Sequence, residues 1–312
     1  MRGKWFEKAK ASGAEIAVEG YEFALKRGER TSRDLVVAFS SGRRFALYRH
    51  DFGRDALYVA DPQLCYFLKE ADGLAREILR FVEREGYERV IFAGSSKGGF
   101  GALAVARLCA RRRPARTFHA VAFSPQVRLF PHNPALYFSS YRRLERRASA
   151  RPGLMRDLRR HGDVSNVGAQ PNLVVEIVCA RDSAIDRAEA RRVAGPNVSH
   201  RVVAGATHGT AFHFMCHGMD RAEIRERILR AYRRSGDADL RQTRPSDLRA
   251  MVEEVARSAV KEPSLNNLFE DVLSRRPAPT TRRGRLLASA RRWLDALAVS
   301  AEKTRSLALG QS

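Results

Sequence analysis

The chain has 312 residues, of which 44% are hydrophobic and 29% are charged. This length and composition support one large domain, or one domain with an appendage, around a sizeable core. Lysine and arginine outnumber aspartate and glutamate by 57 to 35, which gives a formal net charge of +22. Nucleic acid, an anionic membrane surface and an acidic substrate are all compatible with this charge. The alternative is that the charge reflects a codon bias toward arginine and has no functional role.

The cysteines and the apolar runs exclude several classes of protein. Cys65, Cys109, Cys179 and Cys216 form no C-x-x-C pair, so neither a zinc site nor a redox motif is indicated. Residues 1–14 are polar and charged and lack the apolar core of a signal peptide. No run approaches the roughly 18 apolar residues that a membrane-spanning helix requires. We therefore expect a cytoplasmic protein with reduced thiols, no metal and no organic cofactor.

Short apolar runs alternate with helical patterns along the chain, as is typical of a mostly parallel sheet. Residues 15–18 and 21–25 flank Glu19-Gly20 and predict an opening hairpin. Helices are predicted over 73–84 and 98–111, where apolar residues share one face. Six further runs predict buried parallel strands: Leu35–Phe39, Ala56–Ala60, Val90–Ala93, Ala120–Phe123, Leu173–Cys179 and Arg201–Val203.

One long stretch interrupts this alternation. Residues 127–171 lie between two predicted strands, have no strand pattern, and mix aromatic side chains with arginines. A long insertion at such a position is typical of a lid or a substrate-contacting subdomain. The alternative is a helical excursion without a role.

The tail follows a different pattern. Helices are predicted over 246–260 and again from Leu265, and residues 275–284 are typical of a linker. Residues 285–299 then predict a basic amphipathic helix, of the kind that lies on anionic membranes or docks on its own domain or a partner protein. We therefore predict a main domain over residues 1–236, with a lid insertion at about 127–171, and a helical, basic extension over 237–312.

The most informative motif runs from Val90 to Gly101 and combines a predicted strand, a G-x-S-x-G turn and a predicted helix. In a nucleophile elbow the turn is so tight that little side-chain bulk is tolerated beside the serine, which accounts for Gly94 and Gly98. Ser96 would then be exposed above a helix N-terminus, whose N–H groups and dipole favour negative charge. The alternative is a glycine-rich structural turn.

A serine hydroxyl becomes a strong nucleophile only when a base takes its proton. His208 follows the last predicted strand in a small, glycine-containing loop, which makes it the candidate base. Asp182 and Asp186 both follow the preceding strand. Asp186 stands three residues before Glu189, a spacing like that of a capping box, so capping of the next helix is enough to explain its presence. Asp182 is therefore predicted to orient His208, and the order Ser, Asp, His along the chain is that of the hydrolases.

The oxyanion of an acyl transfer needs two backbone donors. The N–H of Lys97, directly after the nucleophile, is predicted to be one. The other is predicted to come from Ser40 or Ser41, after the first parallel strand. The Lys97 side chain is expected to point into solvent, since a cation opposes the helix dipole there. The alternative is that it recognises an anionic substrate.

These features resemble the α/β-hydrolase superfamily over about residues 15–234. The elbow Gly94-Ser95-Ser96-Lys97-Gly98-Gly99, with Phe123-Ser124-Pro125-Gln126 after the next strand, is similar to a narrower bacterial group. That group is associated with surface-polysaccharide and glycan modification and includes acetyltransferase-like proteins of accessory secretion systems. The resemblance implies ester chemistry with acyl transfer to or from a sugar. Two features depart from it: the oxyanion loop lacks the common His-Gly pair, and no helix is predicted between the first two parallel strands.

We therefore expect an α/β-hydrolase fold with helices on both faces of the sheet. The expected activity is that of a serine esterase or acyltransferase acting through an acyl-enzyme on a small-molecule or glycan ester. The main alternative is an inactive scaffold that binds a glycan, a membrane surface or a partner enzyme. Nucleic-acid binding is supported by charge alone, because no RNA-binding, helix-turn-helix or zinc motif is present.

Overall fold

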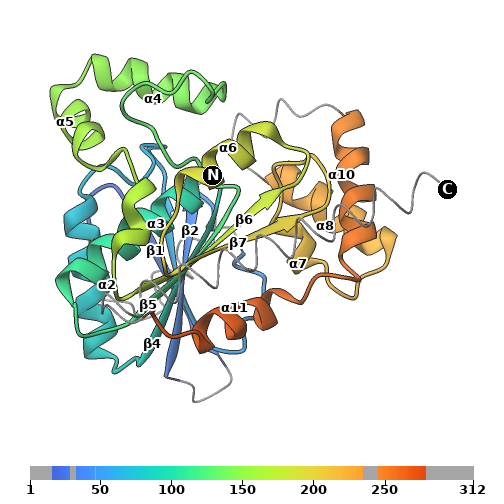
Figure 1. Ribbon diagram of the computed structural model, residues 1–312, viewed down its shortest axis with the longest axis horizontal. Helices are drawn as coiled ribbons and strands as arrows, with labels where there is room; N and C mark the ends of the chain where they lie inside the picture. Colours follow the sequence, from blue (N-terminus) through green and yellow to red (C-terminus); the bar gives the residue numbers. More distant parts are fainter. Residues whose placement is uncertain (1–15, 29–32, 46, 235–244, 279–312) are drawn as a thin grey trace, which may run out of the picture.

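A single twisted sheet forms the centre of the molecule (Figure 1). The computed structural model describes residues 16–28, 33–45, 47–234 and 245–278, and the amphipathic helix predicted over 285–299 lies outside them. The strand order is β1-β3-β2-β4-β5-β6-β7, with β1 antiparallel and all the others parallel to their neighbours. The strands are β1 (Glu22–Lys26), β2 (Asp34–Ser41), β3 (Asp55–Asp61), β4 (Arg89–Ser95), β5 (Phe118–Phe123), β6 (Leu173–Ala180) and β7 (Val198–Val203).

The six predicted parallel strands are present, but the predicted opening hairpin is wrong. Residues 16–18 form no strand, and β1 pairs with β3, with Glu22 opposite Ala60. On the edge of the sheet β1 buries Ala24 against one face and Leu25 against the other. An isolated two-stranded hairpin offers no such burial, which explains the preference for β3.

Alternation along the strands divides the core into two layers. In β2, Leu35, Val37 and Phe39 face one side, whereas Val36 and Ala38 face the other. The first side is covered by α2 (Ala71–Arg84), α3 (Lys97–Arg112) and α6 (Ala184–Arg192), and the second by α11 (Leu265–Ser274) (Figure 1). Helices therefore cover both faces of the sheet, as expected. The described residues that connect β2 to β3 contain only turns and bends.

The insertion between β5 and β6 is helical, in agreement with its lack of a strand pattern. It contains α4 (Ser139–Ser149), α5 (Pro152–His161) and a short 3₁₀ helix, η1 (Ser165–Ala169). The buried carboxylate of Glu189 anchors its start by accepting hydrogen bonds from the backbone N–H groups of Val127 at 2.7 Å and Arg128 at 3.0 Å. In Figure 1 the pair α4 and α5 stands out from the layered core, and its role as a lid stays a prediction.

The helices after β7 belong to the same folded unit as the sheet. After α7 (Phe212–Met215), α8 (Arg221–Arg234) packs against α10 (Pro245–Ser258) through a buried apolar cluster. In α11, Phe269 is 1% exposed and stacks on Phe52 beneath the sheet. The predicted boundary at residue 236 therefore does not separate a core from an appendage, because α11 supplies one wall of the core. Among the described helices, none is long and apolar enough to cross a membrane.

Candidate active site

Ser96 lies in a sharp turn between β4 and α3. Its φ of 54° and ψ of −116° are the strained values that a nucleophile elbow requires. A Cβ on Gly94 would lie 2.2 Å from the backbone oxygen of Gly98, and a Cβ on Gly98 would lie 2.4 Å from that of Phe39. The backbones are thus too close for any other residue. The Ser96 N–H also donates to Phe123 O at 2.8 Å, which ties the elbow to the end of β5.

His208 and Asp186 form a hydrogen-bonded pair after neighbouring strands, with the carboxylate buried and the imidazole half-buried. Asp186 follows β6 and is 2% exposed, and His208 follows β7. The Nδ1 of His208 lies 2.7 Å from Oδ1 of Asp186. Because an ionised carboxylate can only accept, Nδ1 carries the hydrogen and Nε2 is left as a base.

The prediction that Asp182 orients His208 is wrong. Asp182 is exposed, and its backbone N–H donates to Gly205 O at 2.9 Å. The first turn of α6 is capped by Ser183, whose hydroxyl accepts from the N–H of Asp186 at 3.3 Å. Ser183 thus supplies the cap that the sequence argument had assigned to Asp186, and the Asp186 carboxylate turns to the histidine. The spacing Ser183-x-x-Asp186, itself a capping signal, would have revealed this.

Two further residues support the pair and were missed by the sequence argument. Ser124, at a positive φ of 42° directly after β5, donates its hydroxyl to Oδ2 of Asp186 at 2.7 Å. The buried Thr210 hydroxyl lies 3.0 Å from that of Ser124. Both carboxylate oxygens of Asp186 are therefore bonded, which fixes the plane of the carboxylate and through it the imidazole.

Three features together decide the fold: the strand order, a serine in an elbow after one strand, and an acid and a histidine after later strands. The chain has the α/β-hydrolase fold.

No protein-family model and no curated protein matches the sequence. Among solved structures, the capsule O-acetyltransferase of Neisseria meningitidis serogroup A is 16% identical, with 69% of this chain and 91% of that chain covered and a TM-score of 0.45. Carboxyl esterase 2 of the fungus Tuber melanosporum is 16% identical, with coverages of 78% and 82% and a TM-score of 0.46. The carboxylesterase EstE1, from a metagenomic library, is 12% identical, with coverages of 82% and 93% and a TM-score of 0.42. At such low identities these names carry no substrate over to this chain.

The fold places Ser96 and His208 at the same edge of the sheet without a hydrogen bond between them. Ser96 Oγ accepts a hydrogen bond from Nε2 of Gln126 at 3.2 Å. Nε2 of His208 is buried and has no hydrogen-bond partner among the described residues. A buried polar atom without a partner is costly in a folded protein and calls for an explanation, of which a role in function is one. Catalytic hydrogen bonds are often long before substrate binds.

The expectation that Lys97 points into solvent is wrong. Lys97 is 2% exposed, and its ammonium donates to the hydroxyl of Ser140, in α4, at 3.3 Å. The backbone of Lys97 begins α3 directly after Ser96, where a predicted oxyanion donor must lie. Ser40 and Ser41 end β2, whose Phe39 oxygen packs on the elbow, and their donor role stays a prediction.

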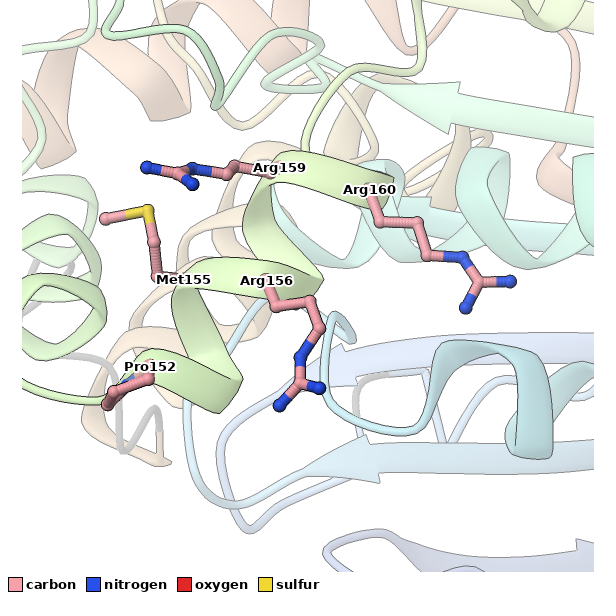
Figure 2. Close-up of a pocket in the computed structure, with 5 residues that line it drawn as sticks. All are labelled: Pro152, Met155, Arg156, Arg159 and Arg160. Atoms are coloured by element: carbon pink, nitrogen blue, oxygen red, sulfur yellow. The ribbon is translucent and has the colours of Figure 1, made fainter.

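The insertion contributes the aromatic side of the site. The ring of Phe138 lies 5.0 Å from that of His208 and stacks on Tyr137, which is 64% exposed. A surface hollow on α5 lies apart from these residues and is lined by three arginines, Pro152 and Met155 (Figure 2). Neither Ser96 nor Asp186 nor His208 lines it. No group of three metal-ligating side chains occurs within the described ranges.

Proposed function

We propose that the protein is a serine esterase or acyltransferase in which Ser96 is the nucleophile, His208 the base and Asp186 the acid that orients the base. One observation carries this proposal: a histidine with its Nδ1 bonded to a buried carboxylate and its buried Nε2 unpartnered, at the sheet edge where an elbow presents a serine. Such an arrangement fits a base that awaits a proton.

The reaction proceeds in two balanced steps. Ser96 Oγ attacks the ester carbonyl carbon, its proton passes to His208 Nε2, and the carbonyl π electrons move to oxygen, where the Lys97 N–H stabilises them. The intermediate collapses, and the alcohol leaves with the proton from His208. Water or a sugar hydroxyl then attacks the acyl carbon and gives its proton to His208. The bond between Ser96 Oγ and the acyl carbon breaks, and His208 returns the proton to Ser96 Oγ.

We further propose that the ester belongs to a glycan or polysaccharide. The resemblance of the elbow to the glycan-modifying group supports this substrate. The stacked rings of Tyr137 and Phe138 support it too, since they offer a flat, partly exposed apolar surface beside His208. The apolar C–H face of a sugar ring fits such a surface.

A second candidate function is that of an inactive scaffold. It is favoured by the hydrogen bond from Gln126 to Ser96, which the structure has in place of a bond between Ser96 and His208. In this case the positive charge, including the basic segment 285–299, would bind a glycan, an anionic membrane or a partner protein.

Labelling with a fluorophosphonate probe distinguishes the two, because only an activated serine reacts readily. We expect one label for each chain of the parent protein and none for Ser96→Ala. An unlabelled parent that is folded would favour the scaffold. Mass measurement of the acyl-enzyme formed from candidate acyl donors, with and without sugar acceptors, would then identify the acyl group and separate hydrolysis from transfer.

A further inference from the structure

A series of buried hydrogen bonds connects the Lys97 ammonium to the nucleophile. Lys97 donates to Ser140 Oγ at 3.3 Å, and Ser140 Oγ lies 2.9 Å from the hydroxyl of Tyr66. That hydroxyl donates to Oε1 of Gln126 at 2.9 Å, and Nε2 of Gln126 donates to Ser96 Oγ at 3.2 Å. We call the first four residues the donor chain. Their exposures range from 1% to 7%.

The direction of the donor chain follows from its two ends. An ammonium can only donate, so Ser140 accepts from Lys97. Tyr66 donates its single hydrogen to Oε1 of Gln126, so in its contact with Ser140 the Tyr66 oxygen is the acceptor. With Oε1 held in this way, the amide of Gln126 can present only N–H to Ser96. The whole series therefore points donors toward the nucleophile.

The backbone around Tyr66 is shaped to place its hydroxyl. Tyr66 and Phe67 both have a φ of 58°, which non-glycine residues rarely adopt. The buried carboxylate of Asp61 stabilises this conformation by accepting from the N–H of Cys65 at 2.7 Å and of Phe67 at 3.1 Å. Backbone strain of this kind persists only where the surrounding structure enforces it, and it concentrates at functional sites.

We propose that the donor chain belongs to the catalytic machinery, with Gln126 a catalytic residue that hydrogen-bonds the nucleophile oxygen of Ser96. Tyr66, Ser140 and Lys97 are positioning residues that act through Gln126. This inference rests on the proposed function.

The chemical consequence is a serine oxygen held in one orientation. The N–H of Gln126 occupies an acceptor position of Ser96 Oγ, so the hydroxyl hydrogen stays available for Nε2 of His208. As that proton leaves, the same N–H stabilises the negative charge on Oγ. Gln126 transfers no proton itself. The positive charge of Lys97, deep in a low-dielectric site, strengthens each successive hydrogen bond. Since Ser140 lies in the first turn of α4, the donor chain also joins the insertion to the nucleophile.

The experiment measures the rate of fluorophosphonate labelling of the full chain, separated into a binding constant and a maximal rate. Tyr66→Phe removes the hydroxyl that fixes the amide of Gln126 and contacts Ser140, and keeps the ring. We expect its maximal rate to fall roughly 10-fold, with the binding constant unchanged. Gln126→Leu removes the donor itself and should lower the maximal rate roughly 100-fold. Tyr21→Phe is the matched control, because Tyr21 stacks on Phe67 yet lies outside the donor chain, and it should label at the parent rate.

The double variant tests whether Tyr66 acts through Gln126. If it does, adding Tyr66→Phe to Gln126→Leu changes the rate no further, whereas independent effects would multiply and overturn the proposal. Lys97→Met, which keeps the length of the side chain, should resemble Tyr66→Phe. Labelling of Tyr66→Phe or Lys97→Met at the parent rate would also overturn it. A parent that does not label refutes the proposed function, and this inference with it, so the two failures are distinguishable.

Discussion

The elbow, residues 94–101, and the histidine loop, residues 204–211, lie at the same edge of the sheet but are held in opposite ways. The elbow is fixed by backbone packed on backbone, with Gly98 against Phe39 O. The histidine loop is largely half-exposed and is held by a distant side chain. The carboxylate of Glu254, in α10, accepts from the N–H groups of Ala206 and Thr207, both at 3.1 Å. The elbow can thus be recognised from consecutive residues, whereas the position of the histidine loop depends on a helix far along the chain.

The largest expected effect concerns the connection between the histidine and its acid. Asp186→Asn replaces the acceptor of His208 by an amide that can present N–H to Nδ1, which stabilises the wrong tautomer. We expect the labelling rate to fall roughly 10³- to 10⁴-fold. Asp182→Asn is the matched control, because Asp182 is exposed, and it should label at the parent rate. Equal losses in both variants would show that the pairing in the structure is not the functional one.

The same contrast explains what the sequence could predict. The elbow, the histidine and the six parallel strands follow from local patterns, because turn tightness and strand alternation depend on neighbouring residues. The choice between Asp182 and Asp186 depends on which residue caps α6, and the structure shows that Ser183 does. The roles of α11 and of Ser124 depend on contacts between distant segments, which periodicity does not report. The predicted opening hairpin was wrong for the same reason, because the pairing of β1 with β3 joins segments that are distant in sequence.

The next effect tests the backbone packing of the elbow. In Gly98→Ala the new Cβ would lie 2.4 Å from Phe39 O, and neither backbone can yield without distorting β2 or α3. We expect the free energy of unfolding to fall by about 3 kcal/mol, with loss of labelling. Gly153→Ala, whose Cβ would lie 4.0 Å from the Arg156 side chain in α5, should change it by less than about 1 kcal/mol. Unfolding in denaturant measures both, and an unperturbed Gly98→Ala would contradict the close packing.

A third effect is a dependence of stability on pH at the base of the histidine loop. His213, in α7, is fully buried and contacts the hydroxyl of Ser258, in α10. Burial lowers its pKa to about 4, although nearby Glu254 acts to raise it. Between pH 6.5 and 4 the unfolded chain therefore binds a proton at this residue that the folded chain does not. We expect protonation of His213 in the unfolded chain to lower the free energy of unfolding by about 2 kcal/mol as the pH falls from 7 to 5.

The comparison variant is His213→Gln, which has no proton to gain in this range. It should be less stable than the parent at pH 7 and should lose about 2 kcal/mol less on acidification to pH 5. Denaturant unfolding at both pH values measures the difference. Parallel losses in parent and variant would mean that His213 titrates normally and that α7 does not shield it.

The smallest effect concerns the hold of α10 on the histidine loop. Glu254→Gln keeps the shape of the side chain but leaves one oxygen for two N–H donors, so either Ala206 or Thr207 faces an NH₂ group. The loop that carries His208 should then sample more positions. We expect the maximal labelling rate to fall roughly 5- to 10-fold, as the loss of about 1 kcal/mol from one hydrogen bond predicts. Glu253→Gln is the adjacent control, since Glu253 pairs with Arg221 on the surface, and it should leave the rate unchanged. If Glu254→Gln also leaves the rate unchanged, the hydrogen bond to Asp186 alone positions His208. The hold of α10 on the histidine loop would then have no effect on function.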